Sequence, residues 1–337
     1  MPAVSIVMPV HNAQPFLDQA IESILGQTFS DFEFVILDDA STDGSADRLA
    51  EWARRDPRIR LLHAETNLGP ALSSQKVATE ATAPIVARMD ADDISLPDRI
   101  AEQLTVLKTH PEVGLVASLH EIIDSRGRKV REPEPWRLAR RSLFVPFSHG
   151  AIMYRQSLFQ EVGGYRSECE FWEDQDLIMR MADVARIMVI PRALFQVRQS
   201  TTSTRVASAQ DRLERAVDLM YRCLDEIERG GDYDQLLRTA DPGAPLDPRV
   251  FVALGSVTLW AGARPRLFRR LLSRTRLSAN FASLSALVWT AWASLSPATL
   301  RKFMQLLLVM RNASAQPVTT SEQLIPWTPL PRIASDR

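Results

Sequence analysis

Short apolar runs of strand length alternate with helix-length segments along the first 120 residues. Strand-like runs cover 4–10, 32–38, 59–63, 84–89 and 113–119, and helical patterns lie between them at 14–28, 44–55, 69–82 and 97–109. Strands that alternate with helices of about 10–15 residues indicate repeated βαβ units. We therefore predict an α/β fold with a mostly parallel central sheet flanked by helices.

The C-terminal part of the chain has a different character. Between residues 249 and 311 there are ten Lys or Arg and no Asp or Glu. We expect a catalytic or binding domain over 1–229, a linker over 230–248, a basic helical region over 249–312 and an extended tail over 313–337. The apolar stretch of the helical region is too interrupted for a transmembrane span. The region is therefore expected either to lie on an anionic membrane surface or to pack as a soluble subdomain.

Bulk properties narrow the class of protein. The formal net charge is −1, which gives no general reason to expect a nucleic-acid partner. Cys169 and Cys223 are far apart and fit no metal or disulfide spacing, which favours reduced thiols. The N-terminal "MPAVSIVMPVHN" lacks the basic start of a signal peptide. We expect a cytoplasmic protein, peripheral on the inner face of the cell membrane if the basic region binds lipid.

Three carboxylates crowd the segment "ARMDADDISLPDR" directly after a strand-like run. Asp90 and Asp92 are two residues apart, so in extended chain they share one face. Hard oxygen ligands on one face suit Mg²⁺ or Mn²⁺, which complete their shells with water and phosphate. The alternative is an acidic turn that leads into a helix beginning near Pro97.

Two further polar clusters follow strand-like runs. "PVHN" ends the first run, and Asp38 and Asp39 in "VILDDASTDGS" end the second. Asx and Ser/Thr turn bonds explain most of the second cluster, although two consecutive acids exceed what a turn needs. Ligands of open α/β sheets bind beyond the carboxyl ends of the strands, so the three clusters are expected to converge there.

Together with "NLG", "VGGY" and "WEDQDLIMR", these segments resemble the family 2 glycosyltransferases, which are inverting enzymes with the GT-A fold. The resemblance covers about residues 3–205. It implies a Rossmann-like GT-A domain with a C-terminal helical appendage. It also implies transfer of a sugar from a nucleotide-sugar donor, UDP-linked most often, to an acceptor hydroxyl. Bacterial surface polysaccharide or glycan assembly is the expected setting, with a glycan or lipid-linked acceptor.

The resemblance also assigns roles to residues. It implies that Asp92 binds the Mn²⁺ or Mg²⁺ that bridges the diphosphate, and that Asp39 contacts uracil with support from Asp38. It implies that Asp174 in "WEDQD" is the catalytic base, with Glu173 as the alternative. Both acids could instead only stabilise the first turn of a helix. The other expected donor-binding residues are Pro9, Val10, His11, Asn12, Asn67, Gly69, Arg88, Asp90, His149 and Arg198.

Two segments depart from the family pattern. Arg198 stands where members often carry a histidine that helps bind metal or diphosphate, and a guanidinium can pair with phosphate but cannot ligate a cation. "NLGPALSSQK" lacks the usual Arg-Asn, with Gln75 and Lys76 nearby. A metal-dependent nucleotidyltransferase and a catalytically silent sugar-nucleotide-binding module are the alternatives. The first would need a Gly-rich, basic phosphate loop that "PVHNAQPF" lacks, and the second needs no "WED" base.

Overall fold

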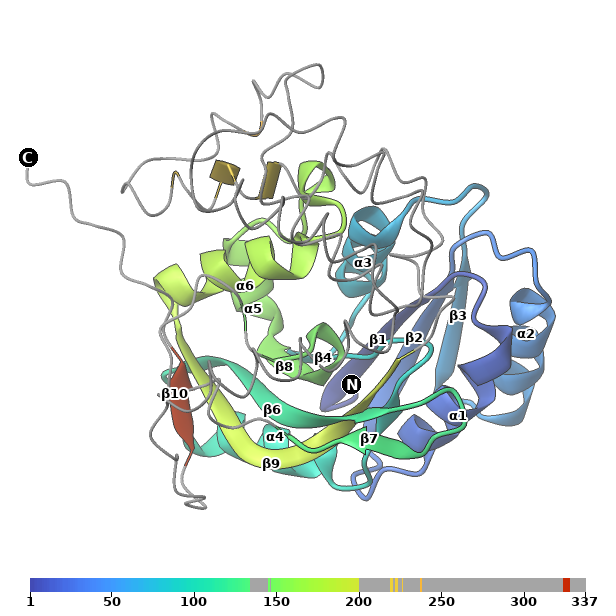
Figure 1. Ribbon diagram of the computed structural model, residues 1–337, viewed down its shortest axis with the longest axis horizontal. Helices are drawn as coiled ribbons and strands as arrows, with labels where there is room; N and C mark the ends of the chain where they lie inside the picture. The colour runs from blue at the N-terminus through green and yellow to red at the C-terminus, as the bar shows by residue number, and fades with distance from the viewer. Residues whose placement is uncertain are drawn as a thin grey trace, which may run out of the picture. The chain divides into compact units, whose positions relative to one another are not determined.

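In the part of the chain that the computed structural model describes, ten strands form one mixed sheet with helices on both faces (Figure 1). The structure describes residues 1–133, 145, 147–199 and 324–327, with isolated positions at 219, 220, 222, 223, 226 and 237. Residues 1–199 and 318–330 form one compact unit, and the rest of the chain belongs to a second. The sheet and all the elements below lie in the first unit.

The strand order is β10-β9-β6-β8-β4-β1-β2-β3, with β5 paired to β9 and β7 to β6. The strands are β1 (Val4–Val10), β2 (Phe32–Asp38), β3 (Ile59–His63), β4 (Ile85–Arg88), β5 (Ile94–Ser95), β6 (Val113–Ile123), β7 (Lys129–Arg131), β8 (Ile152–Arg155), β9 (Arg186–Arg198) and β10 (Ile325–Trp327). The helices are α1 (Gln14–Leu25), α2 (Ser45–Arg55), α3 (Pro70–Thr79), α4 (Arg99–Thr109), α5 (Gln156–Glu161) and α6 (Glu173–Val184), with 3₁₀ turns η2 (His149–Ala151) and η3 (Ser167–Cys169).

The N-terminal half of the sheet is parallel. Strand β1 pairs in parallel with β2 and with β4, and β2 pairs in parallel with β3. Strand β8 then runs antiparallel to both of its neighbours, β4 and β6. Because β1, β2 and β4 point the same way, the loops that follow them meet at one edge of the sheet.

Alternating residues of the strands face two different helical layers. On one face, Ile6 and Met8 of β1 share a core with the buried sides of α1 and α4. On the other face, α3 covers the parallel strands with Val77, which is fully buried. A strand buried on both faces reads as a nearly continuous apolar run, as "VSIVMPV" does.

The sequence-based elements agree with the structure to within a few residues. The first three strands have the expected bounds, and β4 and β6 occupy the expected runs, although β6 continues to Ile123. The expected first helix ends early, at Leu25, where the Gly26 N–H bonds back to the Glu22 carbonyl. The expected linker 230–248 and basic region 249–312 lie almost wholly outside the described residues, so the predicted domain boundaries stay predictions.

A short segment near the C-terminus joins the sheet of the first unit. Strand β10 pairs antiparallel with β9, and Trp327 packs edge-on against Phe147 with ring centroids 5.7 Å apart. An extended tail was expected there, and part of it extends the sheet. Within the residues that the structure describes, no helix is both long and apolar enough to cross a bilayer.

Candidate active site

The loops that follow β1 and β2 brace one another. Asn12 lies in the left-handed region, with φ of 54°. Its side chain reaches the loop after β2. Its Oδ1 accepts the Thr42 N–H at 2.7 Å, and its own N–H donates to Ser41 Oγ at 3.1 Å. His11 Nδ1 lies 2.8 Å from the Asp39 carbonyl oxygen. "PVHN" and "DDAST" therefore form one hydrogen-bonded unit at the carboxyl edge of the parallel strands.

The Asp39 carboxylate organises a third loop at this edge. It is buried and accepts the Leu68 N–H at 2.8 Å and the Gly69 N–H at 3.2 Å, one on each oxygen. Burial raises the pKa of Asp39, and the two amide hydrogen bonds oppose that rise. Gly69 has φ of 82° and also donates to Asn67 Oδ1 at 2.9 Å. Because a carboxylate oxygen accepts more than one hydrogen bond, Asp39 retains capacity for a donor group of a ligand.

The acids after β4 are crowded and partly deprived of water. Burial and the charge of Asp90 together raise the pKa of Asp92 to about 6. Asp93 is buried and accepts the Arg198 backbone N–H at 2.8 Å, and burial raises its pKa well above the ordinary value. In the part of the chain that the structure describes, no three His, Cys, Asp or Glu side chains are arranged to hold a metal. The half-buried carboxylate of Asp92 nevertheless fits Mg²⁺ or Mn²⁺, which take most of their remaining ligands from water and diphosphate.

Two buried guanidinium groups balance these acids. Arg88 Nη2 lies 3.0 Å from Asp90 Oδ1. Arg99 is fully buried and donates to the carbonyls of Arg88 at 3.0 Å and Gly150 at 2.8 Å. Burial lowers the pKa of Arg99 to about 9. Arg99 therefore supplies positive charge from beneath the cluster, and Arg88 neutralises Asp90 directly.

A third arginine lies beside the same acids, at the end of β9. Arg198 Nε donates to the Asp92 carbonyl at 2.8 Å, so the residue that was expected to contact a phosphate contacts the backbone of the acidic turn. The side chain is buried within the protein.

His149 and the acids of α6 belong to one neighbourhood around Tyr165. His149 Nε2 lies 2.6 Å from the Tyr165 hydroxyl oxygen. Burial raises the pKa of Tyr165; the positive charge of Arg88 opposes the rise, and the charges of Glu173 and Asp174 add to it. Electrostatic influence of that kind requires proximity. His149 and the two candidate bases thus lie near the Arg88–Asp90 pair.

The start of α6 presents two acids of unequal exposure. Glu173 is buried, whereas Asp174 is half-buried and its Oδ1 accepts the Gln175 N–H at 2.7 Å. The third acid, Asp176, has a structural role, since its Oδ2 accepts two hydrogen bonds from Arg180, at 3.0 and 2.5 Å. A half-buried carboxylate at a helix start remains available to a substrate, so Asp174 is better suited than Asp176 to accept a proton.

Two residues of this neighbourhood were not singled out from the sequence. Tyr165 was noted only as the end of "VGGY", and Gln75 only as a neighbour of a missing Arg-Asn. Gln75 Oε1 accepts the Tyr165 N–H at 2.7 Å and lies against Gly164, whose φ is 69°. The sequence feature that could have indicated these two residues is the Gly-Gly pair, which implies a tight turn stabilised by a neighbouring side chain.

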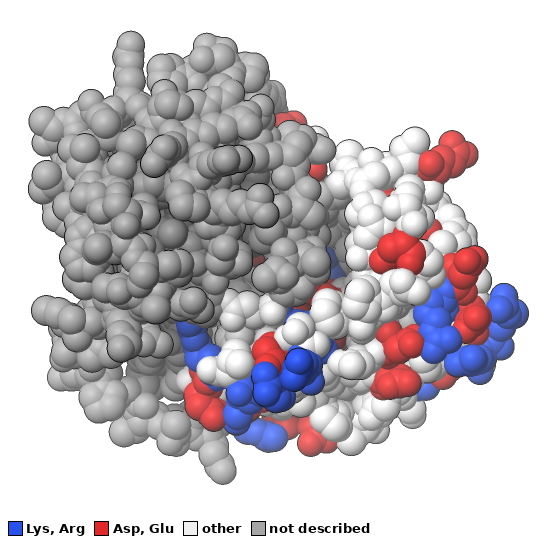
Figure 2. Space-filling view, turned by 45° about the vertical axis from the view of Figure 1, so that its right-hand side comes forward, with Lys and Arg blue, Asp and Glu red and all other residues white. Residues whose placement is uncertain are grey.

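Charges of both signs lie on the face drawn in Figure 2. In the described part of that face, acidic and basic side chains are interspersed and neither sign forms a broad field.

Comparison with known proteins identifies the family. The profile described as Glycosyl transferase family 2 matches residues 5–166. EpsE of Bacillus subtilis (strain 168), a candidate glycosyltransferase, is 32% identical over 231 residues, which are 66% of this chain and 82% of EpsE. The chain belongs to glycosyl transferase family 2. The amylovoran biosynthesis glycosyltransferase AmsE of Erwinia amylovora is 28% identical over 202 residues, or 58% of this chain and 75% of AmsE.

Solved structures of similar shape support the fold. TarS residues 1–349 of S. aureus, in complex with UDP-GlcNAc, align with a TM-score of 0.55 at 17% identity, over 89% of this chain and 91% of that one. A mannosyltransferase of Pyrobaculum calidifontis, in complex with GDP-Man and Mn²⁺, aligns with a TM-score of 0.52 at 19% identity, over 92% and 81%. The expected GT-A fold is confirmed, and this family 2 member is a glycosyltransferase.

Proposed function

We propose that this glycosyltransferase moves a sugar from a UDP-linked donor to an acceptor hydroxyl with inversion, in the assembly of a bacterial surface polysaccharide. The names of several relatives support the setting, among them the amylovoran enzyme and the teichuronic acid glycosyltransferase TuaG, which is 35% identical over 103 residues. The ligands in the related solved structures support a nucleotide-sugar donor, with UDP-GlcNAc bound to TarS and GDP-Man to the mannosyltransferase.

The observation that carries the proposal is the half-buried Asp92 carboxylate beside Asp90, whose pKa of about 6 reflects lost water and a neighbouring negative charge. A divalent cation relieves both effects. When bound there, it would supply Lewis-acid stabilisation to the departing diphosphate. The Mn²⁺ in the mannosyltransferase supports the same choice of metal.

The other residues take roles around that carboxylate. Asp39, supported by Asp38, accepts the uracil imide N–H, while the loops of Asn12 and Asn67 enclose the nucleotide. Asp90 lies near the ribose or sugar with its charge moderated by Arg88. His149, held by Tyr165, faces the donor sugar and the acceptor.

The transfer itself needs one proton acceptor. The acceptor hydroxyl oxygen forms a bond to the anomeric carbon as the bond from that carbon to the diphosphate oxygen breaks, and the nucleoside diphosphate leaves with the electron pair. The hydroxyl proton passes to Asp174, with Glu173 as the alternative base. Attack from the face opposite the leaving group inverts the anomeric configuration.

The test is hydrolysis or transfer with a panel of nucleotide sugars in the presence of Mn²⁺. We expect Asp92→Ala and Asp174→Asn to lower turnover by about 10²–10⁴-fold, the range for a lost general base or charge stabiliser. Asp47→Ala on α2 and Asp183→Asn near the end of α6 are controls, because both acids are exposed. Unchanged turnover in both site variants would refute the assignment, and absence of turnover with every donor would favour the silent binding module.

The location of the enzyme is a separate proposal. Ten cations without an acid between residues 249 and 311 support contact with an anionic lipid surface on the cytoplasmic side of the membrane, where a lipid-linked acceptor would be met. Co-sedimentation of the full chain with anionic and neutral vesicles tests it. Pelleting with anionic vesicles that is lost at high salt is the expected result, and equal pelleting with both kinds contradicts it.

A further inference from the structure

Arg198 joins three separate parts of the donor edge. Besides its bond to the Asp92 carbonyl, Nη1 donates to the Asp124 carbonyl at 3.2 Å and Nη2 to Gln19 Oε1 at 2.7 Å. Its Cζ lies 4.5 Å from the centroid of the Phe16 ring. The guanidinium therefore ties the acidic turn to α1 and to the end of β6.

These contacts leave the guanidinium poorly placed to meet a phosphate. Each of its three nitrogens already donates to a protein oxygen, and one face of the plane lies on an aromatic ring. The residue is only 4% exposed. To reach a diphosphate it would have to abandon several charge-assisted hydrogen bonds, each worth more than a neutral one.

The same contacts fix the acid that would meet the cation. Arg198 holds the turn at two successive residues, through Nε on the Asp92 carbonyl and through its backbone N–H on the Asp93 carboxylate. With the Asp92 carbonyl held and Asp93 tied down, the Asp92 carboxylate has few directions left in which to point. Residues that orient a metal ligand in this way typically affect metal affinity about 10–100-fold.

We propose that Arg198 is a positioning residue for the donor cation, which acts through the backbone of Asp92 and does not touch the diphosphate. The inference rests on the proposed function, since it assumes that Asp92 binds the cation. It assigns to this arginine the support of a ligand, where a histidine at the same place could itself ligate. A lysine is a poor substitute, because its single ammonium cannot span three acceptors in fixed directions.

The experiment separates cation binding from nucleotide binding. Affinity for Mn²⁺ in the presence of UDP is followed by electron paramagnetic resonance of the free ion, and affinity for UDP in EDTA by calorimetry. The variants are Arg198→Ala, Arg198→Lys and the milder Gln19→Ala, which removes one acceptor at an exposed position. Arg58→Ala is the matched control: Arg58 also bonds a carboxylate and a carbonyl and stacks on a phenylalanine, but it precedes β3 at the opposite edge of the sheet.

We expect Arg198→Ala to weaken Mn²⁺ binding about 10–100-fold and to leave UDP binding in EDTA within about twofold of wild type. The Mn²⁺ affinity of Arg198→Lys should lie between those of wild type and Arg198→Ala, and Gln19→Ala should weaken Mn²⁺ binding severalfold. Added guanidinium ion should restore Mn²⁺ binding to Arg198→Ala alone. If Arg198→Ala misfolds, the Lys and Gln19 variants decide. Weaker UDP binding by Arg198→Ala in EDTA would reveal a phosphate contact and overturn the proposal. So would an Mn²⁺ affinity of Arg198→Ala equal to that of the control Arg58→Ala. If Asp92→Ala binds Mn²⁺ normally, the proposed function fails first.

Discussion

The imidazole of His149 and the hydroxyl of Tyr165 lie 2.6 Å apart, and their rings meet edge to face with centroids separated by 5.5 Å. This pair links the turn before β8 to the turn after α5. Since Tyr165 also lies near Arg88, Glu173 and Asp174, the His149 ring has a fixed orientation toward the proposed reaction centre.

Tyr165→Phe removes the hydroxyl and keeps the ring that packs on Phe159. We expect a folded enzyme whose turnover falls about 10-fold because His149 loses its orienting partner, a loss of about 1.4 kcal/mol. Steady-state kinetics with a sugar donor measures the effect. Tyr154→Phe is the contrast, since the Tyr154 hydroxyl is buried without a hydrogen-bond partner among the described residues. That variant should match or exceed wild-type thermal stability and retain turnover, and a reversal of the two effects would contradict the role given to Tyr165.

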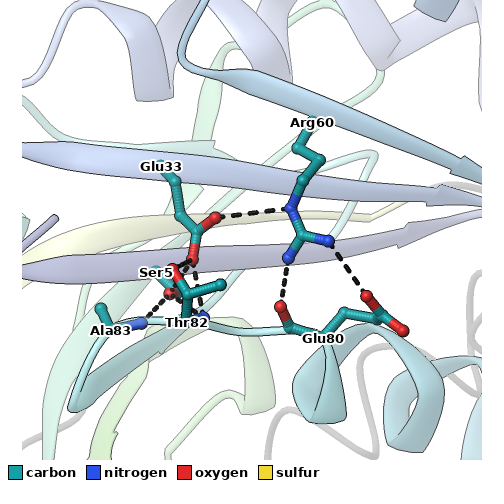
Figure 3. A network of polar contacts seen from close by, with 6 residues as sticks. All are labelled: Ser5, Glu33, Arg60, Glu80, Thr82 and Ala83. Atoms are coloured by element: carbon teal, nitrogen blue, oxygen red, sulfur yellow. Dashed lines mark hydrogen bonds and ion pairs between the residues drawn. The ribbon is translucent and has the colours of Figure 1, made fainter. Parts of the chain in front are cut away.

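A network at the opposite edge of the sheet should govern stability without affecting catalysis (Figure 3). Glu33 accepts hydrogen bonds from Ser5 at 2.5 Å and from the Thr82 hydroxyl at 2.6 Å, and lies 3.5 Å from Arg60. Burial, the largest single influence, raises the pKa of Glu33, but the hydrogen bonds together with Arg60 outweigh it and the net pKa is lowered. Glu33→Gln should therefore lower the free energy of unfolding by about 1–3 kcal/mol at neutral pH.

The pH dependence of that loss has a definite sign. A carboxyl whose folded pKa is depressed stabilises the fold above its unfolded pKa and loses this contribution as pH falls through the folded value. The stability difference between wild type and Glu33→Gln should be constant at neutral pH and shrink below the ordinary pKa of 4.5. Denaturant titrations at several pH values measure it. Glu22→Gln, at an exposed position on α1, should show neither effect, and a gap for Glu33→Gln that widens in acid would disprove the assignment.

Asn12 offers a test of the brace between the two nucleotide loops. Asn12→Gly tolerates φ of 54° but loses the acceptor for the Thr42 N–H, so UDP binding should weaken severalfold with little loss of stability. Asn12→Ala loses the same acceptor and strains the backbone by about 1–2 kcal/mol. Calorimetry with UDP and thermal melts separate the two effects. Wild-type affinity in Asn12→Gly would show that the brace does not shape the site.

The parallel half of the fold was readable from the sequence because each of its strands is bounded by turn residues and followed by a helix. Strand β8 was not, since its four residues are inserted antiparallel between β4 and β6 by contacts remote in sequence. The full length of β9 could not be read from the sequence either, because its second half is stabilised by pairing with β5 and β6, which no local pattern encodes.

The site residues that end strands could be predicted from the sequence, but their hydrogen-bond partners, which are distant in sequence, could not. Asp39 and Asp92 follow directly from their positions, but the amides that hold Asp39 come from residues 68 and 69. The contacts of Arg198 come from α1, the acidic turn and β6, so the sequence indicated only a cation in an unusual place. The role of a charged side chain depends on its burial and its hydrogen-bond partners, and both are set only in the folded chain.

Gly150 provides the sharpest test of the place of Asp90. A Cβ at this position would lie 2.7 Å from Asp90 Oδ2 and 2.5 Å from Phe195 Cζ, closer than ordinary contacts allow. Gly150→Ala must therefore displace the carboxylate or the ring, at a cost of about 1–3 kcal/mol. We expect turnover to fall at least about 10-fold, because Asp90 would lose its alignment with Arg88 and with the donor. Gly127→Ala is the control, since its φ of 78° strains any side chain but no atom of the described residues lies within 4 Å of the added methyl group; it should lose stability and keep activity. If Gly150→Ala lost only as much stability as Gly127→Ala and kept full turnover, the alignment of Asp90 would have no part in the reaction.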